Sequence, residues 1–190
     1  RPANFLGLHF VSPVDKMPLV EIIVGEKTSE ETLARGFDYV LQIGKTPIVV
    51  NDSRGFYTSR VFATYVMEGL AMLAEGVHPR SIEVAGIKAG MPMPPLALQD
   101  EVSLGLSLHV SDQTRRDVEA EGKTYTVHPG EAVMRNVGEV HGRLGKKAGK
   151  GFYDYQGKEK SLWPELTTLY PPQAEQPTQQ DLVDRLMFIQ

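Results

Sequence analysis

The sequence of 190 residues contains no cysteine, a single tryptophan and no long hydrophobic run. The absence of cysteine excludes disulfides, thiolate chemistry and cysteine-ligated zinc. It also fits a reducing compartment, so we expect a cytoplasmic protein. No apolar run approaches the roughly 20 residues that a helix needs to cross a bilayer, and the first residues lack the charged and apolar regions of a signal peptide. We therefore expect no membrane span.

The sequence also lacks a large charge of one sign. Twenty Lys and Arg residues stand against 24 Asp and Glu residues, which gives a formal net charge of −4. This balance provides no general attraction to nucleic acid, so we expect no nucleic-acid partner. Hydrophobic residues make up 41% of the chain and charged residues 23%. These proportions are ordinary for a globular protein and exclude a wholly disordered or fibrous one.

Two kinds of ligand motif are missing. Among 18 glycines, only Gly149-Lys150-Gly151 has the G-x-G spacing, and Asp154 occupies the next glycine position of a dinucleotide fingerprint. No P-loop is present, and we interpret the basic run at residues 145–151 as a solvated loop rather than a phosphate site. No metal is expected, because none of the histidines pair at a ligand spacing: His9, His78, His109, His128 and His141.

The first quarter of the chain has the pattern of a small α/β unit. Residues 5–11, 19–24 and 47–50 are short runs rich in β-forming residues, and the first two are expected to be neighbours in one sheet. Between the second and third runs, Thr28 and Glu31 form a capping-box pattern. An apolar face with helical spacing follows, and Gly44 lies where a helix commonly ends.

After Gly55 the pattern becomes helical, so the chain as a whole is predicted to be mainly α. Helices are expected over 79–90, 96–109 and 131–144, before a partly extended linker at 156–180 and the start of a further helix at 181–190. We expect residues 56–144 to form a bundle with a large exposed apolar face that contacts another copy or another domain. The first helix of this region carries an apolar stripe whose glycine indicates close helix packing: Phe62, Tyr65, Val66, Gly69, Leu70 and Leu73.

One pair of residues in the first two strands is a candidate for chemistry. His9 lies in an apolar strand, and Glu21 is the only acid in the next strand. A buried carboxylate needs a partner, and paired strands would bring the two side chains together. A carboxylate on one imidazole nitrogen fixes the tautomer and leaves the other nitrogen as a base. The residues alone also allow a purely structural pair.

A second candidate region follows the third predicted strand. Residues 51–55 resemble a turn between a strand and a helix, where their polar groups would cap the helix. Ser59 lies one turn inside that helix, near the strand ends where ligands of α/β folds bind.

Several ordered segments together resemble the L-3-hydroxyacyl-CoA dehydrogenase family, over nearly the whole chain. The match is specific because the segments occur in order and at suitable spacing. They are GLHFVSP at 7–13, KMPLVEII at 16–23, GKTPIVVND at 44–52 with GF at 55–56, GMPMPPL at 90–96 and GKKAGKGFY at 145–153.

The resemblance implies a fold and an activity. Residues 1–52 would be the last strands and a helix of a Rossmann-type NAD-binding domain, and 53–155 a helical domain for substrate binding and dimerisation. Members of this family oxidise an L-3-hydroxyacyl-CoA to the 3-ketoacyl-CoA with NAD in fatty-acid β-oxidation. The end of the chain resembles the opening of a second helical repeat in multifunctional members, which also carry an enoyl-CoA hydratase region.

The resemblance also assigns roles to individual residues. His9 would be the general acid/base and Glu21 the residue that orients it. Ser59 would lie near the substrate carbonyl, and Ser12 and Lys147 near NAD. The family often has Asn at the positions of Ser12 and Ser59; serine keeps a donor but is shorter and has no amide.

Family members carry the dinucleotide fingerprint and another active-site serine upstream of the matching region. We therefore expect this chain to hold half an active site, to be inactive alone, and to work as a homodimer or in a complex with a thiolase subunit. One alternative is a non-catalytic helical dimerisation or assembly module with a structural His–Glu pair. Another is a dehydrogenase for a different hydroxy acid or for 6-phosphogluconate-like substrates, which shares the fold logic but not these segments.

Overall fold

A computed structural model describes residues 1–189, so the last residue of the predicted terminal helix, Gln190, lies outside the described residues. The chain divides into two compact units, Arg1–Val61 and the residues from Phe62 onward.

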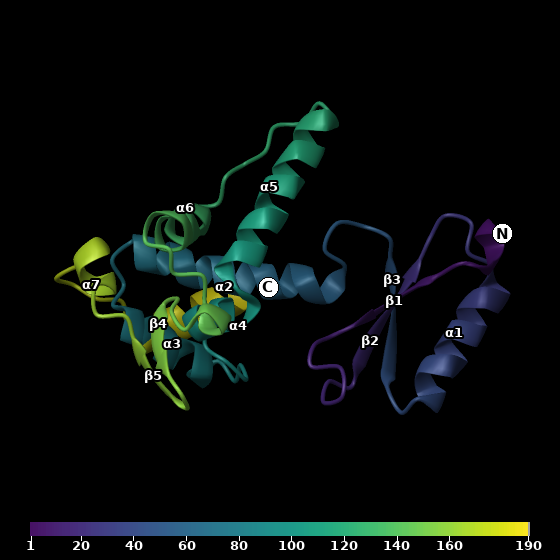
Figure 1. The fold of residues 1–190 in the computed structure, drawn as a ribbon, viewed down its shortest axis with the longest axis horizontal. Helices are drawn as coiled ribbons and strands as arrows, with labels where there is room; N and C mark the ends of the chain where they lie inside the picture. The colour runs from purple at the N-terminus through teal and green to yellow at the C-terminus, as the bar shows by residue number, and fades with distance from the viewer. Residues whose placement is uncertain (190) are drawn as a thin grey trace. The chain divides into compact units, whose positions relative to one another are not determined.

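The first unit is a three-stranded sheet with one helix on it (Figure 1). After a short 3₁₀ turn, η1 (Pro2–Asn4), strand β1 (Gly7–Phe10) pairs antiparallel with β2 (Leu19–Val24). Helix α1 (Glu30–Gln42) then returns the chain so that β3 (Thr46–Asn51) lies parallel to β2. The strand order is β1-β2-β3, which makes β2 the central strand. The predicted strands and their pairing are confirmed.

The two faces of this sheet differ because side chains alternate along a strand. Val20 and Ile22 of β2 are fully buried and pack with Val40 of α1 in a small apolar core. Glu21, between them, therefore points to the opposite face. The predicted cap of α1 is wrong by one residue: Ser29, not Thr28, accepts the N–H of Thr32.

The second unit is mainly helical, and α2 enters it from the first unit. Its elements are α2 (Tyr57–Ala74), α3 (Pro79–Lys88), α4 (Pro95–Val102), α5 (Leu104–Ala120), α6 (Pro129–Arg135), the π-helical turn η2 (Asn136–Val140), the 3₁₀ turn η3 (Lys146–Ala148), strands β4 (Tyr153–Gln156) and β5 (Glu159–Leu162), α7 (Leu166–Leu169) and α8 (Gln179–Phe188).

Close packing around α2 follows from glycine, as predicted. A Cβ atom on Gly69 would lie 2.5 Å from the Cβ of Pro95, so only glycine allows α4 to approach this closely. The stripe on α2 is buried within the unit: Tyr65, Val66, Leu70 and Leu73 are core residues. The prediction that this stripe contributes to a large exposed apolar face is therefore wrong, because later helices of the same unit, among them α3, α4 and α6, pack against it. Exposed apolar residues occur instead on α5 and η2, among them Leu106, Val110 and Val140.

Two of the predicted helices differ from the observed ones. The single helix expected over 96–109 is two helices, because Ser103 has a φ of 85° and interrupts the regular backbone between α4 and α5. The helix expected over 131–144 begins at Pro129, continues as the π-helical turn η2 and ends at Val140.

The predicted linker at 156–180 is a structured part of the second unit. It contains β5 and α7, and Trp163 and Leu166 belong to the hydrophobic core. Helix α8 then packs on α3 and buries Leu182 and Leu186. The proline and glutamine content of this segment favours an extended structure, but apolar residues between the prolines pack into the core and hold it in place.

A buried carboxylate on α4 holds the β4–β5 hairpin against the helices. Asp100 accepts the N–H groups of Phe152 (2.8 Å) and Tyr153 (2.9 Å) on separate oxygens, and the Tyr155 hydroxyl at 2.9 Å. Burial raises the pKa of Asp100 to about 6, although these hydrogen bonds act in the opposite direction. A Cβ atom on Gly151 would lie 1.9 Å from Asp100 Oδ1, so this contact also requires glycine.

We predict that Asp100→Asn lowers the free energy of unfolding by roughly 1–3 kcal/mol, the cost of one unsatisfied buried group. Each oxygen of Asp100 accepts a different backbone N–H, so an asparagine must turn its own NH₂ toward one of them. Urea denaturation measures the effect. The matched control is Glu101→Gln, which weakens only an exposed pair with Lys146 and should cost less than about 1 kcal/mol. Equal effects of the two substitutions would contradict this assignment.

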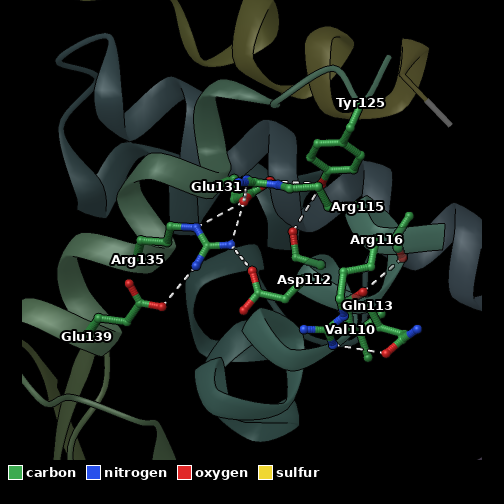
Figure 2. A network of polar contacts seen from close by, with 11 residues as sticks. Val110, Asp112, Gln113, Arg115, Arg116, Tyr125, Glu131, Arg135 and Glu139 are labelled. Atoms are coloured by element: carbon green, nitrogen blue, oxygen red, sulfur yellow. Dashed lines mark hydrogen bonds and ion pairs between the residues drawn. The ribbon is translucent and has the colours of Figure 1, made fainter. Parts of the chain in front are cut away.

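A second polar network joins α5 to α6 (Figure 2). Arg135 donates to Glu131 from Nε at 3.0 Å and from Nη2 at 2.8 Å, and it also pairs with Asp112. Glu131, which is buried, further accepts from Arg115 and from the Tyr125 hydroxyl, both at 2.9 Å. Burial raises the pKa of Glu131, but the hydrogen bonds outweigh it and the pKa is lowered. All of these contacts of the Glu131 carboxylate hold α5, α6 and the segment between them together.

Candidate active site

The register of β1 and β2 brings the predicted pair together. His9 lies directly opposite Glu21 in the antiparallel ladder, and opposite residues of such a pair share one face of the sheet. His9 Nδ1 is 2.6 Å from Glu21 Oε2. The expected hydrogen-bond contact is therefore confirmed. With Nδ1 engaged, Nε2 is the ring nitrogen left to exchange a proton with another molecule.

The start of α2 completes the surroundings of Glu21. The carboxylate is fully buried, yet both of its oxygens are hydrogen-bonded. Thr58 donates its backbone N–H to Oε1 at 2.9 Å and its hydroxyl to Oε2 at 2.7 Å. Burial alone raises the pKa of Glu21, but the Thr58 N–H, His9 and the Thr58 hydroxyl together lower it. Glu21 is therefore a carboxylate near neutral pH.

The histidine remains accessible while its partner is buried. The His9 side chain is 38% exposed and that of Glu21 is 0% exposed. The ring of Phe56 lies beside His9, with centroids 5.7 Å apart and planes tilted by 51°. The His9 ring is thus open to other molecules, whereas the Glu21 carboxylate that orients it is not.

Ser59 directly follows Thr58 in the first turn of α2, so this predicted substrate residue lies one position from the residue that bonds to Glu21. Its side chain is exposed. Gly55, which has a positive φ of 57°, makes the turn that precedes the helix. Among residues 1–189, no group of three or more His, Cys, Asp or Glu side chains is arranged to hold a metal ion. No helix in the same range is long and apolar enough to cross a membrane.

Comparison with known families decides the identity of the chain. The family model for the C-terminal domain of 3-hydroxyacyl-CoA dehydrogenase matches residues 55–155, and the model for the NAD binding domain of the same enzyme matches residues 1–53. The chain belongs to the 3-hydroxyacyl-CoA dehydrogenase family. The predicted fold class, the end of a Rossmann-type domain followed by a helical domain, is confirmed for this family member.

Individual relatives agree with the family. The fatty acid oxidation complex subunit alpha of Shewanella halifaxensis is 42% identical over 161 residues, which are 85% of this chain and 22% of that protein. The subunit of the same name from Vibrio vulnificus is 41% identical over 85% of this chain and 22% of its own length. The chain thus spans about a fifth of the length of the curated relatives that it matches.

Solved structures of the family have the same architecture. The 3-hydroxybutyryl-CoA dehydrogenase of Escherichia coli K12 superposes with a TM-score of 0.71 at 30% identity, over 83% of this chain and 33% of that one. The (S)-3-hydroxybutyryl-CoA dehydrogenase of Ralstonia eutropha gives a TM-score of 0.69 at 33% identity, over 80% of this chain and 52% of that one.

The two predicted cofactor residues of this family member lie in different units. Ser12 is exposed just after β1, three residues beyond His9. Lys147 belongs to η3 in the second unit, where it is exposed between two glycines with positive φ, Gly145 and Gly149. The loop expected at 145–151 is ordered by a bond from the Gly145 N–H to the Lys150 carbonyl.

Two residues that shape the site were missed from the sequence. Thr58 belongs to no recognisable motif. The only available signal is that a buried carboxylate with two oxygens requires more hydrogen-bond donors than one histidine supplies. Lys45 donates from Nζ to the carbonyls of Val14 (2.5 Å) and Met17 (2.7 Å), and so closes the loop that begins at Ser12. Nothing in the local sequence around Lys45 indicates this contact, because its partners are brought close only by the folded chain.

Proposed function

We propose that the full-length protein oxidises L-3-hydroxyacyl-CoA to 3-ketoacyl-CoA with NAD in fatty-acid β-oxidation. The observation that carries this proposal is the 2.6 Å contact between His9 Nδ1 and a buried Glu21 in a chain of the 3-hydroxyacyl-CoA dehydrogenase family. Relatives named as subunits of a fatty acid oxidation complex support the pathway.

In this proposal, His9 Nε2 takes the proton of the 3-hydroxyl group. Bound NAD supplies the hydride acceptor for the carbon that bears this hydroxyl. Imidazole is the side chain that most often serves as a general acid/base in enzymes. Glu21 holds the ring and stabilises the imidazolium that forms, and no proton needs to pass to the carboxylate. In the reverse direction His9 returns the proton to the keto oxygen.

The remaining roles follow the position of each side chain. Ser59, exposed at the start of α2, would bind the substrate near its carbonyl. Ser12, exposed just after β1, and Lys147, exposed in η3, would contact NAD. The residues present fit NAD only at its edge, because the glycine-rich turn that usually binds the pyrophosphate is not among them.

The proposal includes partners and location. Leu106 and Val110 lie one turn apart on α5 and are exposed, which supports contact with a second copy or with a thiolase subunit. A cysteine-free chain is consistent with the cytoplasm. The alternative, a purely structural His–Glu pair in an assembly module, predicts a folded full-length protein that has no dehydrogenase activity.

Formation of NADH by the full-length protein tests the function. With NAD and a short L-3-hydroxyacyl-CoA, we expect an increase at the NADH absorbance band, and no increase with the D isomer or with 6-phosphogluconate. A protein that is folded but forms no NADH from any L-3-hydroxyacyl-CoA would contradict the proposal. NADH formation from 6-phosphogluconate instead would indicate a different hydroxy-acid dehydrogenase.

A further inference from the structure

Thr58 makes two contacts with one carboxylate. Its backbone N–H reaches Glu21 Oε1 at 2.9 Å, and its hydroxyl reaches Oε2 at 2.7 Å. Oε2 is also the atom that His9 Nδ1 approaches at 2.6 Å. Both oxygens of Glu21 are thus engaged, and the oxygen that faces the histidine has two partners.

The hydroxyl contact is not an ordinary feature of a helix. Thr58 lies inside α2, after Tyr57, so it does not occupy the N-cap position where a threonine commonly bonds to its own helix. A threonine inside a helix otherwise often bonds back to the carbonyl four residues earlier. Here the hydroxyl instead reaches a strand residue 37 positions away in the sequence. The contact therefore links the start of α2 to the central strand.

The geometry has a consequence for the carboxylate. Without the hydroxyl, only the backbone bond at Oε1 and the histidine bond at Oε2 would restrain the rotation of Glu21 about its last torsion, which is soft for a carboxylate. The hydroxyl at Oε2 adds a third fixed direction and so restrains this rotation. Because Glu21 in turn directs the His9 ring, the orientation of Nε2 depends on it.

We propose that Thr58 is a positioning residue for the His9–Glu21 pair, acting through Glu21 and not on the substrate. The inference rests on the proposed function, in which His9 is the base. It also identifies what the hydroxyl supplies that the backbone N–H does not: the backbone bond persists with any residue at position 58, whereas the bond to Oε2 requires Thr or Ser.

The test compares Thr58→Val with Thr58→Ser in the full-length protein. Valine keeps the shape of threonine and removes the hydroxyl; serine keeps the hydroxyl. Loss of a hydrogen bond to a charged group changes an equilibrium constant by roughly tenfold or more. We therefore expect Thr58→Val to lower kcat by about tenfold and to change KM by less than about twofold. Thr58→Ser should stay within about threefold of wild type. Tyr57→Phe, which alters an exposed neighbour on the same helical turn, is the control and should leave kcat unchanged.

A double substitution separates positioning from general damage. If Thr58 acts through the pair, adding Thr58→Val to His9→Gln lowers kcat no further, because the side chain that it positions is already gone. An additional tenfold loss would overturn the inference, and so would equal losses in the Val and Ser variants. If the Val variant does not fold by circular dichroism, Thr58→Ala replaces it with the same expectation.

These outcomes are distinct from failure of the proposed function. Wild-type activity in His9→Gln would remove the catalytic role of the pair itself. A large loss in His9→Gln with an unchanged Thr58→Val would instead leave the function in place and reject only the positioning role of Thr58.

Discussion

Replacement of His9 by glutamine in the full-length protein is expected to lower kcat by roughly 10² to 10⁴, the usual contribution of a general acid/base. Glutamine can still donate a hydrogen bond to the buried Glu21, which His9 Nδ1 approaches at 2.6 Å, so the site should stay assembled. It cannot accept a proton at the position of Nε2. Steady-state measurement of NADH formation at saturating substrate gives the effect.

The same substitution should leave NAD affinity nearly unchanged, because the proposed role of His9 is toward the substrate hydroxyl. Isothermal calorimetry with NAD checks this point. His109→Gln is a matched control, since His109 is an exposed histidine of α5, and it should stay within about twofold of wild type. Near wild-type kcat in His9→Gln would remove the catalytic assignment, whereas a lost NAD affinity would show that His9 binds the cofactor.

The contact between His9 and Glu21 could be predicted from the sequence because two independent patterns determine it. Alternation along β2 places Val20 and Ile22 in the apolar core and thereby turns Glu21 to the other face. A carboxylate in such a strand needs a polar partner, and the neighbouring strand offers only His9. The antiparallel register, His9 opposite Glu21, then follows from one consistent pairing of the two strands.

The contacts of Thr58 could not be predicted in the same way. They depend on where the first turn of α2 lies relative to β2, and no local pattern encodes that distance. The break at Ser103 is similar, because a serine with a φ of 85° is tolerated only in a context that tertiary packing imposes.

The prediction of an extended linker at 156–180 is wrong for a related reason. Its prolines and polar residues describe most of its length, but burial of a few residues decides its structure. Trp163 and Leu166 enter the core, and Gln176 bonds to the backbone at both His78 and Gly76. The composition of a segment is an average over its residues, whereas its packing on the rest of the unit depends on a few individual side chains.

Residues 1–190 on their own are expected to bind NAD weakly or not at all and to form no NADH from 3-hydroxyacyl-CoA. Dinucleotide affinity in Rossmann-type domains comes largely from a pyrophosphate on a glycine-rich turn at a helix N-terminus and from an acid on the ribose. The chain has no G-x-G-x-x-G segment. Ser12 and Lys147 offer two edge contacts, which seldom offset the entropy of fixing a free dinucleotide.

Calorimetry with NAD and the NADH absorbance assay, both on the purified chain, test this expectation against the full-length protein as the active control. Circular dichroism must first show the helical signal of the second unit, so that a negative result reflects missing binding groups and not an unfolded chain. In the folded chain, His9 still has Glu21 behind it and can exchange a proton, but nothing beside it accepts the hydride. Micromolar NAD binding, or NADH formed by the isolated chain, would show that these residues hold a complete cofactor site and that the division of the active site proposed here is wrong.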